Sequence, residues 1–202
     1  MNVHSLPGVF MDKRQKILAT AEALLAERGL YGLSMKLLAD TAGVAAGTIY
    51  RYFENKDSLI NELYLYITQE GAQTFFKGWS DEQTPEQKYN RLWRNAFDAV
   101  LKNPQRLIVI EMLFSQPSLA QEQSALCEDS AFFPLLDFYQ QGIDEGRFHN
   151  WQVAALITLS FDSAINLAQK VIRKRLTLDE IQINQVRDAS WLIIQKNFNV
   201  TN

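Results

Sequence analysis

Residues 43–59 read GVAAGTIYRYFENKDSL, and this stretch decides how the fold is interpreted. Gly43 ends one short apolar segment, and a second begins almost at once at Ala46. Ile49 and Phe53 are four residues apart, which places both on one face of a helix. Two short helices joined by a glycine turn predict a helix-turn-helix.

The other face of this second helix is aromatic and basic. Because a helix turns by about 100° per residue, the inward Ile49 and Phe53 leave the remaining side chains pointing outward. Thr48, Arg51 and Tyr52 project away from the core, and Tyr50 and Gly47 flank them. Phenol hydroxyls bind phosphates, and guanidinium or hydroxyl groups reach base edges in the major groove. We therefore expect this face to contact DNA; the alternative is that its aromatic rings cover apolar neighbours at the surface.

The flanking segments complete a helical unit. Upstream, an apolar stripe predicts a helix from Asp12 to Arg28 that Gly29 ends, and Ser34 can cap the first of the two short helices. Downstream, Asn55 can cap a helix over residues 56–71 that links to the rest of the chain.

Residues 43–59 closely resemble the recognition-helix signature of the TetR/AcrR family of bacterial repressors. The resemblance extends upstream through Ala21, Leu25, Gly29 and the helix start at Ser34. It implies an all-α protein of about nine helices. Residues 1–60 would bind DNA, and residues 61–202 would sense a ligand and dimerise.

The resemblance also assigns individual contacts. It implies phosphate contacts by Ser34, Tyr50, Tyr52 and Lys56, and base-edge contacts by Gly47 and Thr48, with Arg51 as a further candidate. Lys56 also suits this role on physical grounds, since a helix start attracts phosphate and its ammonium adds charge. The chain departs from the family at Ala45 and Ala46, where Ser or Thr followed by Lys or Arg is common. We therefore expect a modest or unusually salt-sensitive affinity for DNA.

The second half of the chain predicts further helices. Capping residues and periodicity place them at residues 84–103, 104–115, 118–126, 131–145, 151–174 and 178–197, the last opened by a capping box at residues 177–180. The resemblance implies that helices 151–174 and 178–197 form a homodimer interface. A dimer also suits the DNA, because two recognition helices must be held about 34–36 Å apart. Alternatively, these helices pack only on their own subunit.

Large apolar side chains in this half are candidates for a ligand pocket. They are Trp93, Phe97, Met112, Phe114, Phe138 and Phe161, with Asp162 and Asn166 as polar groups one turn apart. The alternatives are that the apolar residues form the core and that the polar pair faces solvent. The pocket would suit an unidentified small apolar or aromatic effector.

Composition narrows the functional class. The 202 residues carry a net charge of −3, with 47% hydrophobic and 21% charged residues, as in globular proteins. Residues 1–60 hold seven Lys or Arg against six Asp or Glu, so the charge asymmetry weakly favours DNA binding there. The single cysteine, Cys127, and the lack of a leader or a membrane-spanning stretch indicate a cytoplasmic protein without membrane partners.

No catalytic motif or dense metal-ligand cluster occurs, so we expect neither an enzyme nor a metal or other cofactor. The sequence predicts a sequence-specific transcriptional regulator that binds double-stranded operator DNA, a repressor released by its ligand. The remaining alternative is a helical protein-interaction module or ligand-binding protein that does not bind an operator.

Overall fold

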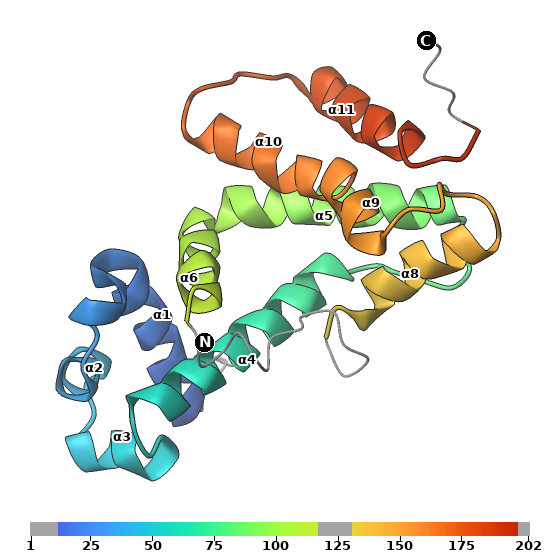
Figure 1. Ribbon diagram of the computed structural model, residues 1–202. Helices are drawn as coiled ribbons and strands as arrows, with labels where there is room; N and C mark the ends of the chain where they lie inside the picture. The colour runs from blue at the N-terminus through green and yellow to red at the C-terminus, as the bar shows by residue number, and fades with distance from the viewer. Residues whose placement is uncertain (1–11, 117–130, 198–202) are drawn as a thin grey trace, which may run out of the picture.

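The computed structural model describes residues 12–116 and 131–197, which fold almost entirely into helices (Figure 1). The helices are α1 Lys13–Gly32, α2 Met35–Ala42, α3 Ala46–Tyr52, α4 Lys56–Phe75, α5 Pro85–Lys102, α6 Pro104–Phe114, α8 Phe133–Asp144, α9 Val153–Leu159, α10 Asp162–Ile172 and α11 Glu180–Leu192. Counting α9 and α10 as one broken helix gives nine in the described residues, so the all-α prediction is confirmed. The helix expected over residues 118–126, and Cys127, lie outside the described residues.

Gly29, with a φ of 67°, kinks α1 but does not end it, because the helix resumes as far as Gly32. The other predicted caps of the first helices form as the sequence indicates. Ser34 Oγ accepts a hydrogen bond from the Leu37 amide at 3.1 Å, and Gly43 ends α2 with a left-handed φ of 67°. Asn55 opens α4 and Thr84 opens α5, each through a complete capping box. These contacts span three residues, which explains why the local sequence encodes them.

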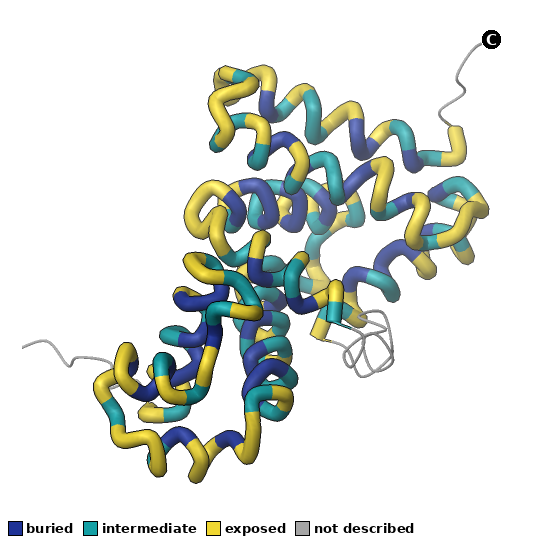
Figure 2. Tube along the Cα trace, turned by 60° about the vertical axis from the view of Figure 1, so that its left-hand side comes forward, coloured by how far each residue is buried: buried dark blue, intermediate teal, exposed yellow. Residues whose placement is uncertain are grey.

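The buried side chains form two clusters. The first joins α1 to α4 and includes Val109 and Leu113 of α6, while the second joins α5 and α8 to α11. Figure 2 shows buried residues along the inner faces of both groups of helices. Because α4 runs from the first group towards the second, it links the helix-turn-helix to the rest of the molecule (Figure 1). Within the described ranges, no helix combines the length and apolar character needed to cross a membrane.

An ion pair connects the two parts of the molecule between α1 and α6. Arg106 Nε and Nη2 donate to the two carboxylate oxygens of Glu22, at 2.8 and 3.0 Å. The hydrogen bonds to Glu22 raise the pKa of Arg106, and the charges of Tyr66 and Glu70 on α4 also contribute. Three helices therefore meet around one guanidinium.

The predicted long helix over residues 151–174 is wrong in one respect, because it breaks between α9 and α10. Ser160 at the break is fully buried, and its hydroxyl lies 2.5 Å from the Leu156 carbonyl and 2.8 Å from the Tyr139 hydroxyl. A buried hydroxyl requires such partners, so the polar contacts of Ser160 fix the break inside an otherwise apolar segment.

The capping box predicted at residues 177–180 is also wrong, because α11 begins two residues later. Asp179 is the N-cap: its carboxylate accepts from the Gln182 amide at 2.8 Å, and Gln182 Oε1 accepts from the Asp179 amide at 3.1 Å. Leu178 packs half-buried against the second core cluster, which holds it outside the helix.

Candidate nucleic-acid interface

The outward face of α3 holds the side chains that the sequence predicts. Ile49 and Phe53 are buried, whereas Tyr50 and Tyr52 are 56% and 40% exposed. Arg51 is also exposed and forms no ion pair among the described residues. An exposed aromatic face with a free guanidinium is suited to a phosphate backbone and to base edges.

The start of α3 leaves room for close approach. Gly47 is exposed, and a Cβ built on it would meet no atom within 4 Å. Thr48 is half-buried on the same turn. Ala45 occupies the N-cap position and makes no side-chain cap, which confirms that the cap expected from the family pattern is missing.

Ser34 and Lys56 border this face from the starts of α2 and α4. The Ser34 hydroxyl oxygen accepts the capping bond, so its proton stays available to a phosphate. Lys56 Nζ donates to the Leu30 carbonyl at 2.6 Å, which ties the start of α4 to the end of α1. An ammonium has three N–H groups, so two remain for other acceptors.

Sequence reasoning missed Tyr31, which is fully exposed. It follows Leu30, the acceptor of the Lys56 bond, and precedes the cap Ser34 by three residues. Tyr31, Tyr50 and Tyr52 are the exposed tyrosines of the described residues. The signal was a tyrosine between Gly29 and Gly32, where no apolar periodicity requires one.

A second contact set holds α3 in place. Arg14 of α1 forms an ion pair with Glu62 of α4, and its guanidinium lies 5.9 Å from the centre of the Phe53 ring. Phe53 follows the last residue of α3, so this contact fixes the helix end against α1 and α4.

The predicted ligand-pocket residues differ in their burial. Trp93, Phe97, Phe138 and Phe161 are buried in the second core cluster, Met112 and Asp162 are half-buried, and Phe114 and Asn166 are exposed. Trp93 stacks on Phe97 with ring centroids 5.6 Å apart and donates from Nε1 to Ser163 Oγ at 2.8 Å. Burial raises the pKa of Asp162.

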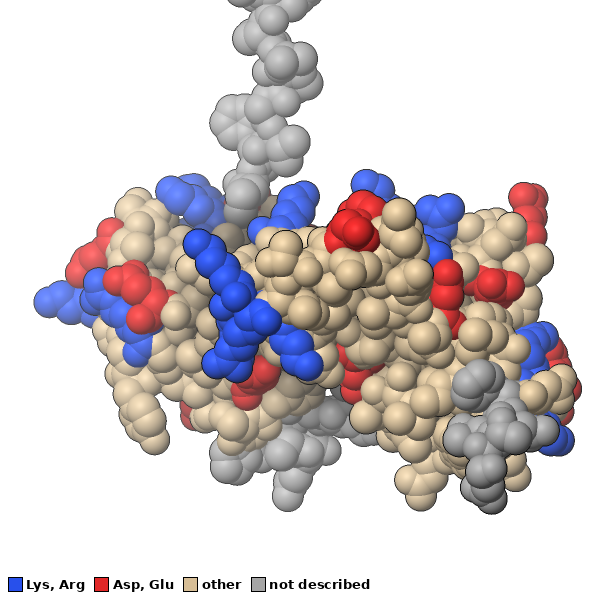
Figure 3. Space-filling view, turned by 90° about the horizontal axis from the view of Figure 1, so that it is seen from above, with Lys and Arg blue, Asp and Glu red and all other residues tan. Residues whose placement is uncertain are grey.

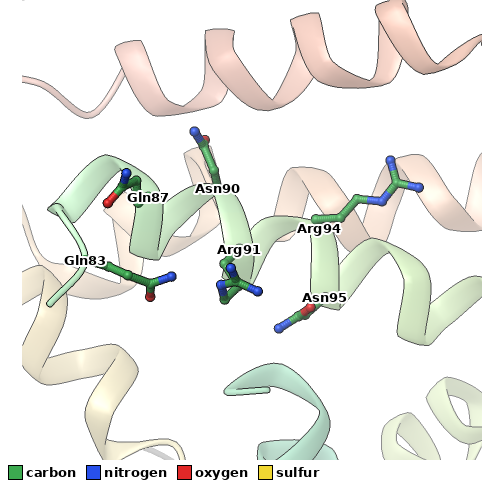
Figure 4. A pocket seen from close by; sticks show the side chains of 6 residues that line it. All are labelled: Gln83, Gln87, Asn90, Arg91, Arg94 and Asn95. Atoms are coloured by element: carbon green, nitrogen blue, oxygen red, sulfur yellow. The ribbon is translucent and has the colours of Figure 1, made fainter. Parts of the chain in front are cut away.

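An open cavity of about 490 Å³ lies elsewhere, on the solvent-facing side of α5. Its lining is polar: Gln83, Gln87, Asn90, Arg91, Arg94 and Asn95 (Figure 4). Asn95 donates to the Phe75 and Lys77 carbonyls, and Arg94 pairs with Asp98 and Glu180, so much of this lining is engaged in the fold. It includes none of the predicted pocket residues.

Comparison with known proteins identifies the family. Residues 17–63 match the model of bacterial regulatory proteins of the tetR family, and residues 85–195 match a tetracyclin repressor-like C-terminal domain. The chain therefore belongs to the tetR family and is a DNA-binding transcriptional regulator of the helix-turn-helix type. Proteins of this family bind operator DNA and act as dimers.

Individual relatives agree along most of the chain. A TetR-family putative transcriptional regulator from Vibrio parahaemolyticus is 34% identical, with a TM-score of 0.83 over 92% of this chain and all of that one. An HTH-type regulator from Haemophilus influenzae is 29% identical over 92% of this chain and 97% of its own length. The repressor KstR2 of Mycobacterium tuberculosis is 24% identical over 70% of this chain and 72% of its own.

Proposed function

We propose that this regulator is a repressor that binds a two-fold symmetric operator as a homodimer and leaves it when a small apolar or aromatic ligand binds. The observation that carries the DNA-binding part is the exposed face of α3, with two tyrosines and a free guanidinium. Exposed aromatic rings gain little free energy from contact with water. In the major groove, by contrast, phosphates and base edges would accept hydrogen bonds from the phenol hydroxyls and the guanidinium.

The proposed contacts divide into two kinds. Ser34, Tyr50, Tyr52 and Lys56 would hold phosphates, and the exposed Tyr31 would extend this row. Gly47, Thr48 and Arg51 would face base edges, where the absent Cβ of Gly47 allows the backbone to approach closely. Among the phosphate contacts, only Lys56 should contribute to the salt dependence of binding, because only charged groups displace condensed counterions.

Dimerisation would use the outer faces of α9 to α11, within the predicted segments 151–174 and 178–197. Trp151, Leu159, Ile181 and Leu192 are 43–69% exposed there, although the opposite faces of these helices are buried in the second core cluster. Apolar side chains on both surfaces of a helix indicate a second partner beyond the core.

The effector would enter the aromatic group where α4 ends. Phe75 and Phe161 have ring centroids 5.2 Å apart, and Trp79 and Phe138 are 5.9 Å apart. A ligand that parts these rings would replace aromatic contacts with its own, and the half-buried Asp162 would offer a polar contact. The protein would thus be a regulator without enzymatic activity. It would act in the cytoplasm, which contains the operators of bacterial genes.

Selection of bound fragments from random duplex DNA tests the proposal. A two-fold symmetric enriched site supports a dimeric reader, and its affinity should fall steeply with salt. A helical interaction module without operator binding would enrich no sequence. Candidate effectors can then be scored by release of that fragment, and tighter binding on ligand addition would contradict repression with release.

Two substitutions distinguish the proposed phosphate contacts. Lys56→Gln should reduce the steepness of the plot of log affinity against log salt by about 0.9, whereas Tyr31→Phe should weaken binding several-fold at unchanged slope. Lys77→Gln, an exposed cation outside this face, is the control. Unchanged affinity in Tyr31→Phe would remove Tyr31 from the interface.

A further inference from the structure

Helix α10 ends in an unusual way. The Arg175 amide donates to the Lys170 carbonyl at 2.9 Å, and the Lys174 amide donates to the Val171 carbonyl at 3.0 Å. This pair of bonds is the Schellman motif, which requires a left-handed residue at its centre. That residue is Lys174, with a φ of 52°.

Glycine usually occupies such a position, because a Cβ is crowded in the left-handed region. Among the described residues, Lys174 is the one non-glycine with a positive φ, whereas Gly43 and Gly146 serve at comparable turns. Backbone strain that the fold retains is a reason to look for a function at that residue.

The same turn concentrates positive charge. Lys170, Arg173, Lys174 and Arg175 are all exposed, and they form no ion pair within residues 12–116 and 131–197. We refer to these four residues as the α10 basic turn. Figure 3 shows Lys and Arg side chains gathered into a ridge on the face that carries α10 and α11.

Most other arginines in the described residues are neutralised. Arg14, Arg28, Arg94, Arg106, Arg147 and Arg187 each pair with a carboxylate. Among the described residues, Arg51 on the face of α3 that would contact DNA and Arg91 of α5 have no such partner. The arginines of the α10 basic turn share this unpaired state in a chain whose net charge is −3.

Stabilisation of the helix end explains only part of this pattern. The partial negative charge at a helix C-terminus favours a cation in the last turn, and Lys170 fills that position. It does not require four mutually repelling cations, nor a lysine where glycine is less strained. A bound polyanion would relieve the repulsion.

We propose that the α10 basic turn is a second, sequence-independent binding site for the phosphate backbone of duplex DNA. The turn lies at the opposite end of the molecule from α3, so the DNA would be a different segment from the one that the recognition helix reads (Figure 1). Duplex DNA is the polyanion that we expect there, because a protein bound to its operator is surrounded by it. The regulator would thus hold two DNA segments together.

The surroundings of the turn favour nucleic acid over an anionic membrane. Peripheral membrane binding combines basic residues with apolar side chains that enter the lipid. Ile172, Leu176 and Leu178 pack against the second core cluster and are not free to insert, and the exposed Ile181 belongs to the face proposed for dimerisation. The apolar face of α10 is likewise buried through Ala164, Leu167 and Ala168.

The test removes operator recognition first, so that its outcome does not depend on the proposed repressor function. In a protein carrying Tyr50→Ala, Arg51→Ala and Lys56→Gln, fluorescence anisotropy with an arbitrary duplex should still show weak binding. The log–log salt slope should be about −3 to −4, since each neutralised phosphate contributes about −0.9. Adding Lys170→Gln, Arg173→Gln and Arg175→Gln should reduce the slope to about −1.

A matched control removes the same charge elsewhere. Lys77→Gln, Arg91→Gln and Lys196→Gln neutralise three exposed cations outside the turn that form no ion pair with the described residues, and they should leave the slope unchanged. Lys174→Gly relieves the strained cap, so it should raise Tm while it lowers the slope by about one phosphate equivalent. Equal slopes in the two triple variants would overturn the proposal, as would binding to phosphatidylserine vesicles without binding to duplex DNA.

Capture on an immobilised operator tests the same inference with the helix-turn-helix intact. Bound protein should retain a second, labelled duplex of unrelated sequence, and the triple variant of the turn should bind the operator normally but lose this retention. Retention that survives the triple variant would refute the assigned site.

Discussion

Cutting the ion pair between Glu22 and Arg106 should weaken the joint between the DNA-binding helices and the rest of the molecule. The Arg106 side chain is 24% exposed and that of Glu22 is 12% exposed, and the pair forms two hydrogen bonds of normal length. Losing one partner of a fully buried pair costs about 3–5 kcal/mol. Because Arg106 keeps access to water, we expect Glu22→Gln to lower the free energy of unfolding by about 2–3 kcal/mol.

The free energies of urea unfolding of wild type, Glu22→Gln, Arg106→Gln and the double variant form a double-mutant cycle. The cycle gives the coupling energy between the two side chains, separate from the other effects of each substitution. We expect a coupling energy of about 2 kcal/mol, with both single variants also shifting operator affinity, because the ion pair joins α1 to α6. The Arg94 and Glu180 pair, which is much more exposed, is the control and should couple far more weakly. A coupling of about 0.5 kcal/mol or less, as in surface pairs, would refute this reasoning.

Three further predictions concern local packing, capping and charge. Gly142→Ala would place a Cβ 2.1 Å from the buried Phe148 ring and should lower the free energy of unfolding by about 2–3 kcal/mol. Gly71→Ala is the control, because its nearest contact would be at 3.6 Å, and it should leave the thermal unfolding temperature nearly unchanged. Ala45→Ser should restore the missing cap of α3 and add about 1 kcal/mol of unfolding free energy, which a lower urea midpoint than wild type would contradict. The raised pKa of Asp162 means that the folded state holds this proton more tightly than the unfolded state does. Native stability should therefore fall as pH rises from about 3.8 through the raised pKa, and Asp162→Asn should flatten that part of a Tm-against-pH curve.

Sequence reasoning succeeded where the cause of a structure lies within a few residues. The cap at Ser34, the turn at Gly43 and the inward pair Ile49 and Phe53 follow from local hydrogen bonds and helical spacing. It failed at the α9–α10 break. A serine in an apolar helix gives no sign of the buried Tyr139 hydroxyl that will meet it, since that partner is 21 residues away.

The candidate site divides in the same way. The outward residues of α3 could be predicted because one helix face has to be inward. By contrast, the bond from Lys56 to the Leu30 carbonyl joins groups 26 residues apart, which no local pattern could indicate. In the sensor half, aromatic content alone does not distinguish a pocket from a core, and only the structure shows that Trp93, Phe97 and Phe161 are buried in one cluster.

The sequence by itself therefore determined that this protein is helical, that residues 43–59 form a helix-turn-helix segment and which side chains face outward from it. Helical periodicity and capping are properties of neighbouring residues, so they are readable without a fold. Only the tertiary structure decided that Arg106 joins α6 to Glu22, that Ser160 meets Tyr139 where the helix breaks, and that the cations of the α10 basic turn form no ion pair with the described residues. Each of these depends on which distant groups the packed helices bring together, and no local pattern records that.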